Sequence, residues 1–256
     1  MKISIIQTDL VWENKKVNLD TFKQIIDTIS EETDLIILPE MFSTGFSMSA
    51  SLLAEDINGP TVSWMKEIAA KKKCAITGSI ILKSGKHYFN CLIWADEKQL
   101  LTYNKRHLFT YSGENNHYSA GTEKTIVHYR GWNILPLICY DLRFPVWSRR
   151  TKKENYDLLI YVANWPERRN VAWKTLLPAR AIENQSFVVG VNRIGNDNKN
   201  IFHSGDSAVY DFKGEKLSSL SAIENKYETI ELSLTELIKH RETFAFGYDA
   251  DYFELK

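Results

Sequence analysis

The 256-residue sequence has little that would place it in a membrane or against nucleic acid. No apolar run approaches the roughly 20 residues that span a bilayer, and the apolar start ends at Gln7, too early for a signal peptide. Basic and acidic residues both number 32, so the formal net charge is zero. Nucleic acid and anionic membranes therefore have no electrostatic support as partners. We expect a cytoplasmic protein.

Cysteine is also scarce. The three residues Cys74, Cys91 and Cys139 are odd in number and far apart, which excludes a disulfide framework and a paired zinc motif. The six histidines form no close ligand set, so no metal site is expected. In a reducing compartment each thiol is free, and its surroundings decide whether it reacts. We expect Cys74 and Cys91, in apolar strand contexts, to be inert.

The sequence lacks a linker rich in Gly, Ser or Pro, which favours one domain over residues 1–256.

What is present is an alternation of apolar, β-branched runs with amphipathic stretches. Helices are expected at 18–32, with Asn18 as N-cap, at 60–73, at about 146–152, and at 171–185, where Pro178 should kink or split the helix. Strands are expected at 3–8, 34–40, 75–82, 87–96, 100–105, 132–139, 156–165, 186–193, 206–211 and 227–233. Hairpin-length links mixed with strand–helix units predict a layered α/β protein with a mixed sheet. The tail from about residue 236 remains unassigned.

Three chemically useful side chains stand at strand ends, where ligands bind in layered α/β folds. Glu40 closes "LIILPE", Lys105 follows "LLTYN", and Cys139 closes "ILPLIC". Taken singly, each is more often a solvated charge or a core thiol. Together they supply a base, a cation and a nucleophile, which suffice for acyl transfer from an amide. Lys105 and the backbone N–H of Tyr140 are the candidate donors to the oxyanion that such an attack creates.

The motifs "LPEMF", "YNKRHLF" and "CYDLRFP" resemble, in order and separation, the three signatures of the nitrilase superfamily of carbon–nitrogen hydrolases. The resemblance runs from Ile3 to about Glu231. It implies a four-layer αββα sandwich, a Glu40–Lys105–Cys139 triad, no metal or organic cofactor, and assembly into a homodimer or higher homo-oligomer, with the tail as a possible interface extension. It also assigns Glu114 in "GENNHYSAG" as a second glutamate beside Lys105.

The longer strings "LPEMFSTGFSM" and "GWNILPLICYDLRFPVWSR" are similar to the omega-amidase branch of that superfamily. This similarity implies hydrolysis of the terminal amide of 2-oxo acids, namely 2-oxoglutaramate, 2-oxosuccinamate and the methionine keto-acid amide. An N-carbamoyl amino acid or aliphatic amide hydrolase with the same triad remains an alternative, and a catalytically silent binding or scaffold protein is a remote one.

A substrate of this kind has an anionic end remote from its amide, and the site needs a cation or donors for it. Arg143 is a candidate, with an ion pair that holds its own loop as the alternative. Trp165 and Phe46 are candidates for the pocket wall, although Trp165 equally suits a core or an interface. We expect Arg168 and Arg169 to be surface charges, and His107 to support the site without reacting.

Overall fold

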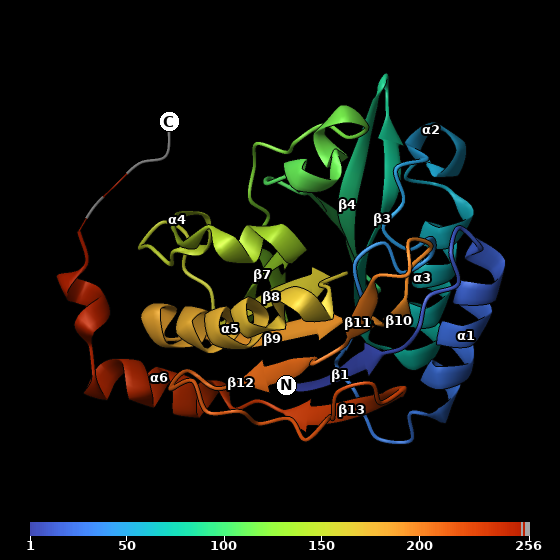
Figure 1. Ribbon diagram of the computed structural model, residues 1–256. Helices are drawn as coiled ribbons and strands as arrows, with labels where there is room; N and C mark the ends of the chain where they lie inside the picture. Colours follow the sequence, from blue (N-terminus) through green and yellow to red (C-terminus); the bar gives the residue numbers. More distant parts are fainter. Residues whose placement is uncertain (252, 254–256) are drawn as a thin grey trace.

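The computed structural model describes residues 1–251 and residue 253, and its chain folds into two mixed β-sheets with helices outside them (Figure 1). In the first sheet, β1, β2 and β3 run parallel, and β13, β4 and β5 extend its two edges by antiparallel pairing. Its strands, in spatial order, are β13 (Lys226–Glu231), β1 (Lys2–Gln7), β2 (Leu35–Ile37), β3 (Ala75–Ser84), β4 (His87–Ala95) and β5 (Leu100–Asn104).

The second sheet is built in the same way, with a parallel centre and antiparallel edges. Its strands, in spatial order, are β12 (Ala208–Tyr210), β9 (Phe187–Asn192), β8 (Leu158–Ala163), β7 (Trp132–Ile138) and β6 (Val127–Tyr129). A separate ribbon pairs β10 (Ile194–Asn196) with β11 (Phe202–Ser204). The expectation of mixed sheets is therefore confirmed.

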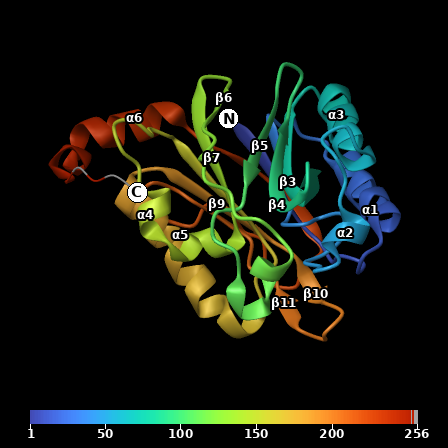
Figure 2. The ribbon, with the colours of Figure 1, turned by 90° about the horizontal axis from the view of Figure 1, so that it is seen from above.

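Alternate residues of the first sheet face two different cores. Ile3, Ile5 and Ile37 pack with the residues of the second sheet. Ile6 and Ile36 pack against the outer helices α1 (Lys15–Thr28) and α3 (Pro60–Lys72). This alternation follows from the two-residue period of a strand and buries both faces of the sheet. Figure 2 shows the result from above, with α1 and α3 on one side of the paired sheets and α5 and α6 on the other.

The remaining helices are short, apart from α5 (Asn170–Asn184) and α6 (Leu234–Thr243). The α-helical turns are α2 (Ala50–Leu53) and α4 (Pro145–Ser148), and the 3-10 turns are η1 (Thr110–Ser112), η2 (Glu114–Asn116), η3 (Cys139–Arg143), η4 (Glu167–Arg169) and η5 (Phe246–Asp249). The helix expected at about 146–152 is thus shorter and begins one residue earlier, with Pro145 at its first turn.

One expectation about a helix is wrong, and one of the two alternatives for another is not observed. Asn18 is not an N-cap: α1 begins three residues earlier, and Asn14 caps it by accepting a hydrogen bond from the N–H of Val17. Asn18 is instead buried inside the first turns. Pro178 does not split α5, which runs as one helix from Asn170 to Asn184. The proline removes one N–H from the helix, and packing of buried α5 residues such as Trp173 and Leu177 on the second sheet maintains the helix.

The tail that the sequence left unassigned begins with α6, capped by the Ser233 side chain, and continues into η5. Residues 252 and 254–256 of the proposed interface extension lie outside the described residues. Within the described part of the chain, no helix combines the length and the apolar character needed to cross a membrane.

Candidate active site

Glu40 follows β2 after two residues and is fully buried. Both of its carboxylate oxygens have donors. Oε1 accepts hydrogen bonds from Lys105 Nζ at 2.8 Å and from Asn90 Nδ2 at 2.7 Å. Oε2 accepts from the backbone N–H of Asn164 at 2.8 Å. These contacts come from β4, from the end of β5 and from the end of β8, so the two sheets together fix the orientation of the carboxylate.

Lys105 directly follows β5, and its ammonium lies between two carboxylates. Besides Glu40, it donates to both oxygens of Glu114, each at 3.0 Å. Burial by itself would lower the pKa of Lys105, but the charges of Glu114 and Glu40 outweigh it and raise that pKa above its usual value. Lys105 is therefore a permanent cation in a site closed to water, where a charge acts most strongly.

Glu114 belongs to η2 in the loop after β5 and is also fully buried. It accepts hydrogen bonds from Asn90 Nδ2 at 3.1 Å and from the backbone N–H of Phe109. Burial raises the pKa of Glu114; Lys105 opposes this shift, while Glu40 adds to it. The structure thus brings Glu40, Lys105 and Glu114 into direct contact, as the sequence predicts.

Cys139 stands where β7 turns into η3, with its backbone in the left-handed region at φ +42°. A non-glycine residue rarely adopts this conformation, and such strain is common where a turn has to present a side chain. Burial, the charge of Glu40 and a hydrogen bond to that carboxylate raise the pKa of Cys139 well above its ordinary value. Lys105 and the N–H of Asn164 act in the opposite direction. The resting pair is therefore a neutral thiol beside a carboxylate.

The strained turn is held by Asp141, which is fully buried. Its carboxylate accepts hydrogen bonds from the N–H of Ile138 at 3.1 Å and from the hydroxyl of Tyr103 at 2.7 Å. It also binds the N–H and Nδ1 of His107, at 3.0 and 2.8 Å. His107 stacks on Phe144, with ring centres 3.7 Å apart. This histidine supports the nucleophile turn, in agreement with the prediction.

The backbone N–H of Tyr140 lies in the first turn of η3, where N–H groups have no acceptor inside the helix. It directly follows the thiol, and Lys105 and the Asn164 N–H are further donors close to Cys139. Phe46 also borders this cluster, because its ring centre is 5.2 Å from Lys105 Nζ.

Trp165 and Arg143 contact each other. Trp165 is buried, and its Nε1 donates to the carbonyl of Arg169 at 2.9 Å. The Arg143 guanidinium lies over the Trp165 ring, 4.7 Å from its centre. Among the described residues no acidic side chain pairs with Arg143, so the alternative of a loop-holding ion pair is not observed. Trp165 also contacts the Trp173 ring, with centres 5.4 Å apart, so it belongs to the core as well as to the site.

Asn90 and Asn164 are parts of the site that sequence reasoning missed. Asn164 follows β8 directly, so the strand-end argument that selected Glu40 could have found it. Asn90 is a buried polar residue among the apolar residues of β4, and the sequence around it carries no signal of a role in the site. The Oδ1 atom of Asn164 is buried and has no hydrogen-bond partner among the described residues, so it is an acceptor available to a ligand.

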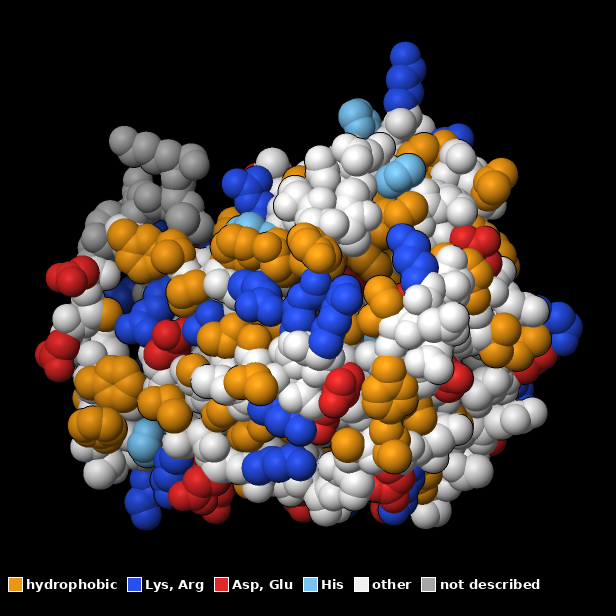
Figure 3. Space-filling view, viewed as in Figure 1, with side chains coloured by type: hydrophobic (Ala, Val, Ile, Leu, Met, Phe, Trp, Pro, Cys, Tyr) orange, Lys and Arg blue, Asp and Glu red, His pale blue; other side chains and the backbone are white. Residues whose placement is uncertain are grey.

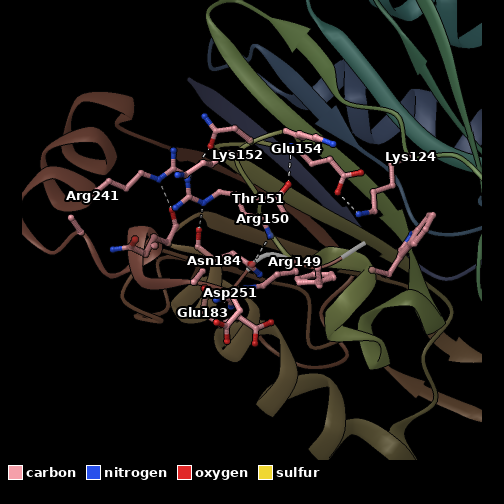
Figure 4. Close-up of a pocket in the computed structure, with 18 of the residues that line it drawn as sticks. Lys124, Arg149, Arg150, Thr151, Lys152, Glu154, Glu183, Asn184, Arg241 and Asp251 are labelled. Atoms are coloured by element: carbon pink, nitrogen blue, oxygen red, sulfur yellow. Dashed lines mark hydrogen bonds and ion pairs between the residues drawn. The ribbon is translucent and has the colours of Figure 1, made fainter. Parts of the chain in front are cut away.

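A pocket of about 860 Å³ lies elsewhere, between α4, the end of α5 and the C-terminal segment (Figure 4). None of the residues described above as the core of the site lines it. Three of its cations have protein partners: Lys124 pairs with Glu154, Arg149 donates to the carbonyl of Glu183, and Arg241 pairs with Asp157. This pocket is therefore separate from the buried cluster. Within the described ranges, no three His, Cys, Asp or Glu side chains are grouped as a metal site.

Comparison with known proteins identifies the class that this fold and this cluster define. The family model for carbon-nitrogen hydrolases matches residues 2–241. The chain is 43% identical to Omega-amidase YafV of Escherichia coli (strain K12), over all of this chain and 98% of that protein. It is 34% identical to the 2-oxoglutaramate amidase of Bacillus subtilis (strain 168), over 94% of both.

Among solved structures, XC1258 from Xanthomonas campestris superposes with a TM-score of 0.96 at 42% identity, over 100% of this chain and 99% of that one. It is described as a CN-hydrolase superfamily protein with an arsenic adduct in its active site. The chain therefore belongs to the carbon-nitrogen hydrolase family. It is an amidohydrolase that acts on carbon–nitrogen bonds, and its two sheets and outer helices form the αββα sandwich of the nitrilase type.

Proposed function

We propose that the protein is an omega-amidase that hydrolyses the terminal amide of 2-oxo acids, with 2-oxoglutaramate as the model substrate, to the acid and ammonia. The observation that carries this proposal is the buried cluster of Glu40, Lys105 and Glu114 against the Cys139 thiol. The substrate class is supported by the two relatives named as amidases of this kind, one of which matches the full length of the chain.

In the first step, Glu40 removes the proton of the Cys139 thiol as the sulfur attacks the amide carbon. The raised pKa of Cys139 means that the thiolate is not preformed, so a base in contact is required. The donors on Glu40 come from Lys105, Asn90 and the Asn164 N–H, and they fix its direction. Proton transfer and attack thereby occur from one fixed geometry.

The attack places a negative charge on the amide oxygen. Lys105 and the Tyr140 N–H donate to this oxyanion, and both are in place before the reaction begins. Glu114 holds the Lys105 ammonium in its direction and keeps it charged. The free Oδ1 atom of Asn164 accepts a hydrogen bond from the amide N–H of the substrate.

In the second step, Glu40 passes its proton to the amide nitrogen, and the carbon–nitrogen bond breaks. Ammonia departs, and the acyl group remains bound to Cys139 as a thioester. Glu40 then takes a proton from water, and the oxygen attacks the thioester. Collapse of this intermediate expels the Cys139 sulfur, which takes the proton back from Glu40, and the acid leaves. Phe46 and Trp165 wall the pocket, and Arg143 binds the carboxylate at the remote end of the substrate.

We further propose one domain over residues 1–256, a location in the cytoplasm and assembly into a homodimer or higher homo-oligomer through the outer layers and the tail. The single family match over residues 2–241 and the core shared by both sheets support the single domain.

The test is ammonia release from 2-oxoglutaramate by the purified protein, beside its Cys139→Ala and Glu40→Gln variants. We expect release by the wild-type protein and none by Cys139→Ala, because no thioester can form. Glu40→Gln should lose nearly all activity. Lys105→Ala should lower kcat by about 100-fold or more, because it removes a donor to the oxyanion. Substantial release by Cys139→Ala would contradict the mechanism. A wild-type protein that cleaves only carbamoyl amino acids or aliphatic amides would contradict the substrate.

A further inference from the structure

Arg168 and Arg169 were both expected to be surface charges, but of the two only Arg168 is exposed. Arg169 ends η4, a few residues beyond β8, and is half-buried. Its guanidinium carbon lies 5.1 Å from the ring centre of Phe109 and 5.0 Å from that of Tyr111. Two aromatic rings therefore hold this guanidinium in place, while no such ring contact is seen for Arg168 in the part of the chain that the structure describes.

These contacts connect Arg169 to the nucleophile. The Phe109 ring lies 5.0 Å from that of Tyr140, the residue directly after Cys139. The charge of a Cys139 thiolate also acts on the pKa of Arg169. Arg143 approaches the same place from η3, over Trp165, which follows the Asn164 that binds Glu40. Both arginines are thus one aromatic ring away from the catalytic segments.

Arg143 and Arg169 line one open depression at the molecular surface, together with Val171, Ala172, Thr175 and Leu176. This lining contains no acidic residue. Figure 3 shows basic side chains gathered on the middle of the face that it presents, next to a row of hydrophobic ones. Among the described residues, no hydrogen bond or ion pair joins either guanidinium to a protein group. By contrast, Arg180, Arg193 and Arg241 each pair with an acidic side chain.

Two guanidinium groups that line one depression without an acidic partner repel each other unless an anion binds both. Burial lowers the pKa of Arg169, and the positive charges of Arg168 and Arg143 lower it further. The buried cluster, in contrast, has an excess of negative charge. With Glu40 and Glu114 ionised around one Lys105, it carries a net charge of −1, which repels an anionic substrate. Cations at the entrance would offset that repulsion.

We propose that Arg169 joins Arg143 as a second guanidinium that binds the substrate carboxylate, and that this pair selects linear amides bearing a carboxylate over neutral amides. The inference rests on the proposed amidase function and adds its specificity. A planar guanidinium binds a carboxylate through two parallel hydrogen bonds. The rings of Trp165, Phe109 and Tyr111 fix the two planes.

The test compares two four-carbon amides that differ only in a carboxylate or a methyl group at the remote end, succinamate and butyramide. The variants are Arg169→Ala and Arg169→Lys, with Arg168→Ala as a control that removes the same charge one residue away. We expect Arg169→Ala to lower the ratio of kcat/KM for succinamate to that for butyramide by about 10- to 100-fold, mainly through KM. Arg169→Lys should recover part of this ratio, because lysine keeps the positive charge but cannot form the two parallel hydrogen bonds of a guanidinium.

A second readout is salt. The KM of the wild-type protein for 2-oxoglutaramate should rise with ionic strength, and this dependence should be weaker in Arg169→Ala. An equal loss on both amides, or an Arg168→Ala effect as large as that of Arg169→Ala, would overturn the role of Arg169. If the wild-type protein cleaves another carboxylate-bearing amide but not 2-oxoglutaramate, the proposed substrate is wrong. The roles of Arg143 and Arg169 are then tested on the amide that is cleaved. If the wild-type protein cleaves only neutral amides, both proposals fall.

Discussion

At the scale of single residues, the site concentrates charge where water is excluded. Lys105 is 1% exposed and has both Glu40 and Glu114 at hydrogen-bond distance. Removing one partner of such a group leaves a buried charge uncompensated, which is far more costly than losing a surface ion pair. The contacts among these three buried charges therefore contribute strongly to holding the cluster together.

The three thiols should differ in their reaction with iodoacetamide. Cys139 is 8% exposed, against 1% for Cys74 and 0% for Cys91, and it alone contacts a base. Burial raises the pKa of Cys74 to about 12. We expect iodoacetamide at neutral pH to label Cys139 first, and Glu40→Gln to slow that labelling. Mass mapping of peptides from samples stopped at successive times measures the three rates.

The pH dependence of the same labelling reports the state of the thiol. Because the pKa of Cys139 is raised well above its ordinary value, the thiolate fraction should keep increasing through a pH of about 9. A plateau near a pH of about 7 would instead show a preformed thiolate and contradict the role of Glu40 as the base. Equal labelling of Cys74 or Cys91 would remove the distinction between the nucleophile and the core thiols.

Sequence reasoning at this scale depended on motifs. Glu40, Lys105 and Cys139 were predicted together because three ordered motifs carry them, and the family resemblance added Glu114. The structure brings these four side chains together. Asn90 was not predicted, because one asparagine inside a strand does not show which carboxylate it will bind. Arg169 was misjudged as well: its aromatic partners Phe109 and Tyr111 are about 60 residues away in the chain, and only the fold unites them.

At the scale of elements, the residues of the cluster stand mostly at strand ends, while Asn90 donates from inside β4 and Glu114 approaches from the loop after β5. β2, β5, β7 and β8 each end at or just before a residue of the cluster. Ten strands were predicted, because apolar β-branched runs have a clear signal, but the short strands β6, β10 and β11 were not. Helix boundaries were predicted less well, since the cap of α1 depends on where the preceding loop has to turn.

The two asparagines of α1 provide a matched test of that boundary. Asn14 is an exposed cap on the N–H of Val17, so Asn14→Ala should lower the free energy of unfolding by about 1 kcal/mol. Asn18 is 1% exposed; it accepts from the N–H of Val11 and donates to the carbonyls of Val11 and Ser43. Asn18→Ala leaves buried backbone groups unpaired and should cost about 2–4 kcal/mol. Urea unfolding measures both, and a larger loss for Asn14→Ala would contradict this assignment.

At the scale of the whole molecule, the site exists only because two sheets face each other. Glu40 and Lys105 follow strands of the first sheet, whereas Cys139 and Asn164 follow strands of the second. The layered α/β class was predictable from the alternation of strands and helices. The pairing of the sheets was not visible in the hydrophobic pattern, because a strand buried on both faces looks the same whichever neighbour covers each face; it came from the family resemblance.

Two adjacent isoleucines of β2 allow the effect of sheet spacing on the site to be distinguished from the effect of packing on stability. Ile36 and Ile37 are both fully buried, but Ile36 faces the outer helices and Ile37 faces the second sheet. Replacing either by Ala should lower the free energy of unfolding by about 2–5 kcal/mol. Only Ile37→Ala opens space between the sheets that hold Glu40 and Cys139. Because small misplacements of reacting groups slow a reaction strongly, only this variant should also lower kcat/KM, by about tenfold. The rates are measured well below both unfolding midpoints. Equal losses of kcat/KM in the two variants would show that the spacing of the sheets does not control the site.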